Sequence, residues 1–206
     1  MKNLLLTLAV LALVFAVNDP SMAAGKMSLG VGADVLLPMG NFGDGYSTGF
    51  GGSVRGQYDV TPMFSAGLTV GYFTWSGKDQ TVFGQTFTLP NFKGLPIRVF
   101  GKYYFMPESE KLRVYGMFEL GLFFGSTGDE TVANPFAGLP GQPATVTVSG
   151  TSSSDFNYAP GVGLELPLGG GNTKLDVSVR YDGIARSGDS AGNIAARVGV
   201  NFGLGN

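Results

Sequence analysis

The sequence predicts an all-β protein: an eight-stranded antiparallel transmembrane up-and-down β-barrel. Apolar residues alternate with small or polar residues in eight separate segments, and a period of two is the signature of a β-strand. Charged residues fall repeatedly on the face opposite the apolar one, which suits a barrel with lipid outside and a polar interior. The connections between the segments are alternately long and short, which is typical of such barrels.

The first segment reads as a targeting signal that precedes the barrel. Lys2 comes before an apolar run over residues 4–17, which is shorter than the roughly 20 residues that a membrane-spanning helix needs. Small residues stand one and three positions before a cut after Ala23. We predict a secretory signal peptide over residues 1–23 and a barrel domain over residues 24–206. The alternative is a retained anchor helix.

Eight alternating segments follow. One of them places Leu95, Ile97 and Val99 on one face, and Arg98 and Lys102 on the other. The predicted strands are residues 27–37, 49–60, 64–75, 95–105, 112–124, 156–166, 175–182 and 194–204. Most are close to the 9–11 residues that a tilted strand needs to cross a bilayer. Pro160 has no N–H for the ladder, so a bulge or the rim of the strand is expected there.

The connections indicate an orientation. The predicted long connections are residues 38–48, 76–94, 125–155 and 183–193, and the short ones are 61–63, 106–111 and 167–174. Because outer-membrane barrels have short periplasmic turns and long external loops, both chain ends are expected in the periplasm. Residues 144–148 alternate again. They predict either a strand that extends beyond the membrane or a disordered loop.

The composition excludes several classes of function. Charged residues make up 14% of the chain, well below the roughly 25% of a soluble domain, and the net charge of −2 provides no basic surface for nucleic acid. The chain has no Cys and no His. These absences remove disulfides, thiolate metal sites and the commonest general base and metal ligand. We therefore expect no enzyme activity, no cofactor and no metal site.

The inward-facing positions carry a balanced set of charges. They are the cations Arg55, Arg98, Lys102, Arg113, Arg180 and Arg197, and the anions Asp34, Asp59, Glu119, Glu165, Asp176 and Asp182. Side chains fill the interior of an eight-stranded barrel, and buried charges need partners. The sequence therefore predicts a lumen charge network and a plug rather than a pore. The alternative is that several of these charges lie at the wet rims.

One ion pair can be predicted individually. If the turn over residues 106–111 pairs Phe105 with Leu112, Arg98 lies directly across from Glu119. We expect these two side chains to form a salt bridge in the lumen.

Several short motifs are similar to those of a known family. They are Leu37-Pro38-Met39-Gly40-Asn41-Phe42-Gly43, Gly49-Phe50-Gly51 leading to Gln57-Tyr58-Asp59-Val60-Thr61-Pro62, and Leu95-Pro96-Ile97 running into Lys102-Tyr103-Tyr104-Phe105. With them the chain resembles the outer membrane protein beta-barrel domain family, of the OmpA/OmpX type. The resemblance implies the outer membrane of a Gram-negative bacterium, and contact with outer-membrane lipid and lipopolysaccharide. It also implies that periplasmic chaperones and the barrel-assembly machinery are partners.

The last predicted strand looks like the signal that the barrel-assembly machinery reads. The residues that carry this signal are Arg197, Gly199, Phe202 and Leu204. The chain departs from the family pattern because it ends on Gly205-Asn206 where many members end on an aromatic residue.

Three functions remain open on the sequence. The first is a structural or surface-interaction barrel with its specificity in the external loops. The second is a narrow OmpW-like channel for ions or small apolar solutes, which an apolar stripe in the lumen would favour. The inward aromatic residues are Phe73, Trp75, Phe100, Tyr104, Tyr115 and Phe123, and they either form such a stripe or simply fill the lumen. The third is a soluble lipocalin-like binder, which would need its apolar face inward.

Overall fold

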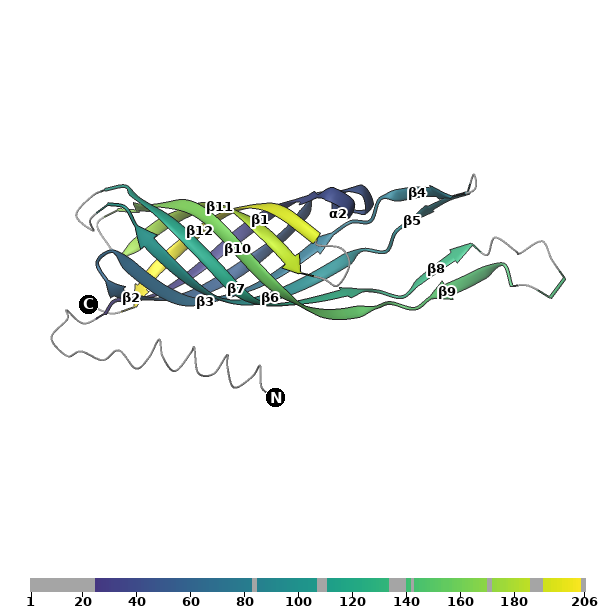
Figure 1. Cartoon of the computed structure of the whole chain (residues 1–206), viewed down its shortest axis with the longest axis horizontal. Coiled ribbons are helices and arrows are strands. Elements are labelled where there is room, and N and C mark those ends of the chain that lie inside the picture. Colours follow the sequence, from purple (N-terminus) through teal and green to yellow (C-terminus); the bar gives the residue numbers. More distant parts are fainter. Residues whose placement is uncertain are drawn as a thin grey trace.

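A closed antiparallel barrel forms the body of the molecule. The computed structural model describes residues 25–82, 85–106, 111–133, 140–141, 143–169, 172–185 and 191–204. The barrel strands are β1 (Met27–Met39), β2 (Gly49–Thr61), β3 (Phe64–Trp75), β6 (Phe92–Tyr104), β7 (Arg113–Thr127), β10 (Ser152–Pro167), β11 (Thr173–Ala185) and β12 (Ala191–Leu204). Each barrel strand pairs with the next barrel strand along the chain, so that β3 pairs with β6 and β7 with β10, and β1 pairs with β12 to close the barrel. The strands wind obliquely around the long axis (Figure 1).

The alternation seen in the sequence separates the outside of the barrel from the lumen. Leu29, Val31 and Val35 of β1 are exposed on the outer surface, whereas Asp34 is 1% exposed. The same alternation recurs on β6, where Arg98 is buried and Ile97 is exposed. An exposed apolar exterior around a charged interior is the reverse of a soluble barrel and matches a barrel that lipid surrounds. This placement contradicts the lipocalin-like alternative, because that protein needs the apolar face inside.

Two β-hairpins extend the barrel at one end, which we call the hairpin end. The first consists of β4 (Asp79–Val82) and β5 (Gln85–Thr88), and the second of β8 (Glu130–Ala133) and β9 (Thr145–Val148). Both project along the barrel axis, well past the other strands (Figure 1). The opposite end, which we call the turn end, carries the connections that follow β2, β6 and β10. The end of β12 also lies there (Figure 1).

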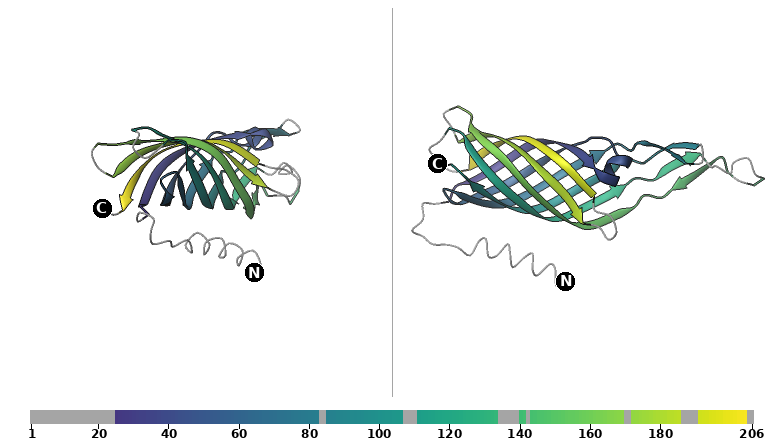
Figure 2. Two further views of the ribbon diagram at one scale, coloured as in Figure 1. Left: turned by 60° about the vertical axis from the view of Figure 1, so that its left-hand side comes forward. Right: turned by 45° about the horizontal axis from the view of Figure 1, so that its top comes forward.

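A short helix folds over the hairpin end. Helix α2 (Gly40–Gly45) follows β1 directly, and the chain turns into it at Gly40, whose φ of 57° favours glycine. Figure 2 shows α2 beside the mouth of the barrel. No helix among the described residues is long and apolar enough to cross a membrane.

The strands differ from their predicted bounds mainly at the hairpin end. Strands β6, β7 and β10 extend three or four residues further than predicted, because backbone pairing continues beyond the region where apolar residues alternate. Residues 145–148 form β9 and pair with β8. The signal-peptide prediction falls on residues 1–23, which lie outside the described residues.

The expectation of a bulge or strand rim at Pro160 is wrong. Pro160 lies well inside β10 and pairs with Phe118 of β7 in an unbroken register. On the other side, the pairing of β10 with β11 is interrupted between Tyr158 and Gly161 but resumes in the same register. The missing N–H of proline therefore costs local pairing with one neighbour and does not shift the strand.

Candidate functional site: the closed lumen

The lumen is filled by a network of ion pairs that begins near the hairpin end. Arg180 donates to Asp34 at 2.8 Å and to Asp182 at 2.9 Å. Asp182 also accepts from Arg98, with 2.9 Å between Nη1 and Oδ1. All four side chains are at most 5% exposed. Each carboxylate in this part of the lumen therefore has a cationic partner, as buried charges require.

The network continues toward the turn end through two further carboxylates. Glu119 forms an ion pair with Arg98, with 2.9 Å between Nε and Oε2, and accepts a hydrogen bond from Arg55 at 2.8 Å. Lys102 then joins Asp176 to Glu165, with both Nζ–O distances at 2.9 Å. Because Arg55 also approaches Asp176 at 3.5 Å, the two parts form one connected network. With Arg197, which binds Asp176, the fully buried part of the network contains five cations and five anions and has no net charge.

Asp176 is the most heavily used acceptor of the network. Besides Lys102, it accepts from Nη1 of Arg197 at 2.8 Å and from the Tyr115 hydroxyl at 2.9 Å. These donors come from β6, β7 and β12, while Asp176 lies on β11. The carboxylate thus connects strands from around the barrel.

Two glycines make room for the Arg197 guanidinium. Gly32 and Gly199 face one another across the β1–β12 seam, and the Arg197 side chain lies against both. A Cβ at Gly32 would stand 2.7 Å from Cζ of Arg197, and a Cβ at Gly199 would stand 2.7 Å from its Nη1. Any larger residue at either position would displace the arginine. Gly199 is therefore also a packing residue of the lumen.

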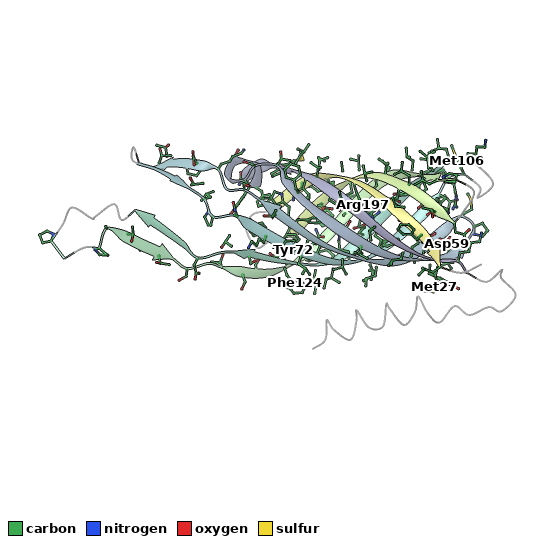
Figure 3. All side chains as sticks on the ribbon, turned by 180° about the vertical axis from the view of Figure 1, so that it is seen from behind. Met27, Asp59, Tyr72, Met106, Phe124 and Arg197 are labelled. Carbon is green, nitrogen blue, oxygen red and sulfur yellow. The ribbon has the colours of Figure 1, made fainter. Side chains whose placement is uncertain are left out.

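Of the twelve charged residues predicted to form the lumen network, ten belong to it and two do not. Arg113 is buried, but it donates to the carbonyl of Pro62 at 2.6 Å and lies 3.7 Å over the Tyr104 ring. Asp59 is only half-buried and accepts from Gln57 and Ser65. Both lie at the turn end, so the expectation that they belong to the lumen network is wrong. Figure 3 shows Asp59 at this end of the barrel and Arg197 deeper inside.

The predicted salt bridge between Arg98 and Glu119 is present, but the register that predicted it is wrong. Arg98 pairs with Gly121 and Glu119 with Phe100, so the two charged residues are diagonal rather than directly opposite. Phe105 bonds to the carbonyl of Val114, two residues from the predicted partner. A shift of two keeps each side chain on its face. The long arginine side chain reaches the diagonal carboxylate.

Several polar residues that complete the network were not predicted as site residues. Ser53 donates to Asp34 at 2.6 Å and accepts from Arg197 at 2.9 Å. Tyr104 donates to Glu165 at 2.9 Å, and Lys174 approaches Glu165 at 3.7 Å. The inward positions of Ser53 and Tyr104 follow from the strand alternation, but a neutral side chain in such a position is not itself a signal of a site. Lys174 lies in a predicted connection, so its contact with Glu165 could not be predicted.

An apolar lid closes the lumen at the hairpin end. The fully buried Trp75 packs against Phe42 and Phe92, with ring centroids 5.6 and 5.7 Å apart, and against Phe123 at 6.3 Å. Helix α2 supplies Phe42. The end of helix α2 is held against the start of the first hairpin, because the backbone N–H of Lys78 donates to the carbonyl of Gly45 at 2.8 Å. The inward aromatics Phe73, Trp75 and Phe123 therefore pack in this lid, whereas Phe42 and Phe92 were not predicted.

The aromatic lid and the ion-pair network lie one behind the other along the lumen. A solute that crossed the barrel would have to displace the aromatic lid and then separate ion pairs in the network below. Within the described ranges, no group of three or more Asp or Glu side chains is arranged to hold a metal ion.

Solved structures with the same architecture are outer-membrane barrels. A major outer membrane protein from Thermus thermophilus matches with a TM-score of 0.60 and 16% identity, covering 88% of this chain and 100% of that one. Neisserial surface protein A matches with a TM-score of 0.57 and 16% identity, covering 85% and 96%. Ail, the attachment invasion locus protein of Yersinia pestis, matches with a TM-score of 0.52 and 16% identity, covering 88% and 100%.

The sequence comparison identifies the family. No curated protein matches the chain in sequence, and the solved structures are too distant to show more than the fold. The family model of the outer membrane protein beta-barrel domain, however, matches residues 6–202. The chain therefore belongs to the outer membrane protein beta-barrel domain family.

Proposed function

We propose that this protein is a structural or surface-interaction barrel of the outer membrane, with a closed lumen and with its specificity in the hairpins. The observation that carries the proposal is the double closure of the lumen by the aromatic lid and the ion-pair network. A wide aqueous channel belongs to barrels of about 16 strands. Here both layers of side chains would have to open before a solute could pass.

The two hairpins supply the surface for interaction. Each is a two-stranded sheet outside the barrel, so its edges have backbone donors and acceptors that a partner strand can use. The first hairpin has polar cross-strand contacts, namely the 3.1 Å contact between the Thr81 and Thr86 hydroxyls and the bond from Thr88 to Asp79. Polar side chains suit an arm that stands in water. The names of two structural neighbours, a surface protein and an attachment protein, fit such a role.

The hairpin end faces the outside of the cell in this proposal, and the short turns face the periplasm. Export through a cleaved signal peptide is part of the same proposal. Assembly would use the last strand, in which Phe202 and Leu204 are exposed on the outer face while Arg197 and Gly199 pack in the lumen.

Conductance tests whether the lumen is closed. The refolded protein is inserted into a planar bilayer, and insertion is confirmed by the protease resistance of the barrel. We expect a membrane without discrete openings, because the network and the lid are both intact. Reproducible single-channel openings would overturn the proposal and would favour the alternative, a narrow channel for ions or small apolar solutes.

Cysteine labelling tests the orientation. The chain has no native Cys, so a single introduced thiol reports its own position. Thr145→Cys places it on β9 of the second hairpin, and Lys111→Cys places it at the turn end; both native side chains are exposed. In intact cells, a membrane-impermeant maleimide should label only the first variant. Labelling of the second variant alone would reverse the orientation.

A further inference from the structure

A pocket lies on the outer side of the aromatic lid, at the hairpin end of the barrel. It has a volume of about 480 Å³, and residues of α2, β6, β7 and β10 line it. We call it the mouth pocket. The lid residues Phe42 and Phe92 line it, whereas Trp75, which packs against both, is fully buried. The size of the mouth pocket is within the usual range of sites for small ligands.

Three aromatic rings form the floor of the mouth pocket. The Tyr46 ring lies 4.8 Å from that of Phe42 and 5.7 Å from that of Phe92, and the last two are 5.6 Å apart, measured between centroids. Tyr46 itself is half-buried. Its backbone is fixed, because its N–H donates to the carbonyl of Phe42 at 3.1 Å and it forms a β-bridge with Gly77. The floor is therefore a continuous apolar surface that is held in place without a ligand.

Hydroxyl groups form the adjoining wall. Thr127 lies directly across from Phe92 in the pairing of β6 with β7. Its hydroxyl lies 3.2 Å from that of Thr151 and accepts from the backbone N–H of Thr151 at 3.0 Å. Ser153 donates to the carboxylate of Asp155 at 2.8 Å. A hydroxyl has one donor and two acceptor positions and a carboxylate has about four acceptor positions, so these bonds use only some of them. The wall therefore suits a ligand that is rich in hydroxyl groups.

Charge narrows the class of ligand. Among the described residues that line the mouth pocket, Asp155 is the single charged one. An anionic ligand would meet this carboxylate with no lysine or arginine of those residues to compensate. A wholly apolar ligand would cover the carboxylate and the hydroxyls without giving them hydrogen bonds, which is unfavourable. An organic cation would use the rings and the carboxylate but not the hydroxyl wall. The ligand that suits every side is neutral and has both an apolar face and hydroxyl groups.

From this arrangement we propose that the mouth pocket binds a neutral saccharide. A pyranose ring presents C–H groups on one face, and this face stacks on Tyr46 and its neighbours, because the face of an aromatic ring carries partial negative charge. The hydroxyl groups at the edge of the sugar exchange hydrogen bonds with Thr127 and donate to Asp155. This assignment rests on the proposed function, because a glycan outside the cell reaches the pocket only if the hairpin end faces outward.

Binding is tested by isothermal titration calorimetry of the refolded protein in octyltetraoxyethylene micelles, whose headgroups are neither sugars nor charged. The probes are the methyl pyranosides of glucose, galactose and mannose. Each is compared with the corresponding uronic acid, which adds a negative charge to the same ring, and with choline, an organic cation. We expect at least one neutral pyranoside to bind with a dissociation constant of about 1 mM. Its uronic acid and choline should bind about tenfold more weakly.

Four variants locate the site. Tyr46→Ala removes the half-buried ring and should weaken binding about tenfold, whereas Tyr46→Phe keeps the ring and should bind within a few-fold of the unchanged protein. Tyr72→Ala is the matched control. It removes a ring from the exposed outer face toward the same end of the barrel (Figure 3) and should leave binding unchanged. Asp155→Asn keeps an acceptor oxygen without the charge, so it should retain the neutral sugar within a few-fold and bind the uronic acid more tightly than the unchanged protein does.

Several results would overturn the proposal. They are the absence of binding by all three neutral pyranosides, equally tight binding of the uronic acids or of choline, and an equal loss in Tyr46→Ala and Tyr72→Ala. If Tyr46→Ala does not fold, unchanged discrimination against the uronic acid in Asp155→Asn has the same consequence. Because micelles have no sides, binding is independent of orientation. Sugar binding together with reversed cysteine labelling would refute the surface role alone, and the expected labelling without sugar binding would refute the pocket alone.

Discussion

Replacement of Asp176 by asparagine should be the most damaging isosteric change in the lumen. The substitution keeps the volume of the side chain but removes its charge. Three donors, Lys102, Arg197 and Tyr115, lie within 2.9 Å of the carboxylate. The five-to-five balance of the network becomes five cations to four anions in a region that is almost fully buried.

The contacts that remain determine the size of the effect. Lys102 keeps its ion pair with Glu165 at 2.9 Å, and Arg55 keeps its ion pair with Glu119 at 2.8 Å. Arg197 keeps the Ser53 hydroxyl at 2.9 Å and loses its ion pair. One buried and uncompensated charge costs about 3–5 kcal/mol, so the free energy of unfolding should fall by about that amount.

The assay is urea unfolding of the refolded barrel in lipid vesicles, followed by tryptophan fluorescence. Trp75 is the single tryptophan of the chain and is fully buried in the lid, so its emission reports loss of the lumen packing. Asp59→Asn is the matched control. Asp59 is half-buried at the turn end and is outside the network, and its replacement should cost less than about 1 kcal/mol.

A second substitution tests the electrostatic reason directly. Arg197→Met in the Asp176→Asn background restores a neutral network, and the double variant should be more stable than the sum of the two single effects predicts, by about 1–3 kcal/mol. The reasoning is refuted if Asp176→Asn costs no more than Asp59→Asn, or if the two lumen substitutions are simply additive.

Four other variants give results that the structure specifies in advance. Gly32→Val should lower the free energy of unfolding by about 3 kcal/mol, because it displaces Arg197; Gly56→Ala should change it by less than about 0.5 kcal/mol, because a Cβ there meets no atom within 4 Å. Phe42→Ala opens part of the lid but leaves the ion-pair network, so bilayer recordings should stay silent; openings would show that the lid alone closes the lumen. Replacing residues 129–150 by a short linker should leave the urea midpoint unchanged, since the barrel pairs Ser126 with Ser152 below that hairpin; a lower midpoint would show that the hairpin supports the barrel.

The barrel and its polarity could be predicted from the sequence because both depend only on alternation. Each strand presents one face to lipid and one to the lumen. Whether a residue stands at an odd or an even position along its strand therefore decides which face it is on. The placement of Arg98 and Lys102 inside and of Ile97 outside required no knowledge of the register. The soluble alternative fails for the same reason.

The register and the connections within the lumen could not be predicted, because they depend on turn geometry and on barrel curvature. The turn between β6 and β7 is longer by two residues than predicted. Each side chain therefore stays on its predicted face, but Arg98 lies diagonally across from Glu119 instead of directly opposite. Pairs such as Asp34 with Arg180 join β1 to β11, which are not adjacent. Such contacts exist only after the sheet has curved into a tube.

The lid could be predicted only in part, because two of its rings, Phe42 and Phe92, come from outside the predicted strands. Phe42 belongs to a six-residue helix, which carries no periodic signal at that length. Phe92 precedes the predicted start of its strand by three residues. The short helix brings Phe42 onto Trp75, and the extension of β6 places Phe92 directly opposite Trp75.

The distribution of the ion pairs among the strands makes closure of this barrel an all-or-none event. Seven of the eight strands contribute a charge to the network, from Asp34 on β1 to Arg197 on β12. An open sheet that lacks the β1–β12 seam leaves Arg197 away from the Gly32 position that receives it, and separates Asp34 from Arg180. Partly assembled forms therefore carry unmatched charges inside the membrane, and only the complete ring of strands is electrically neutral within.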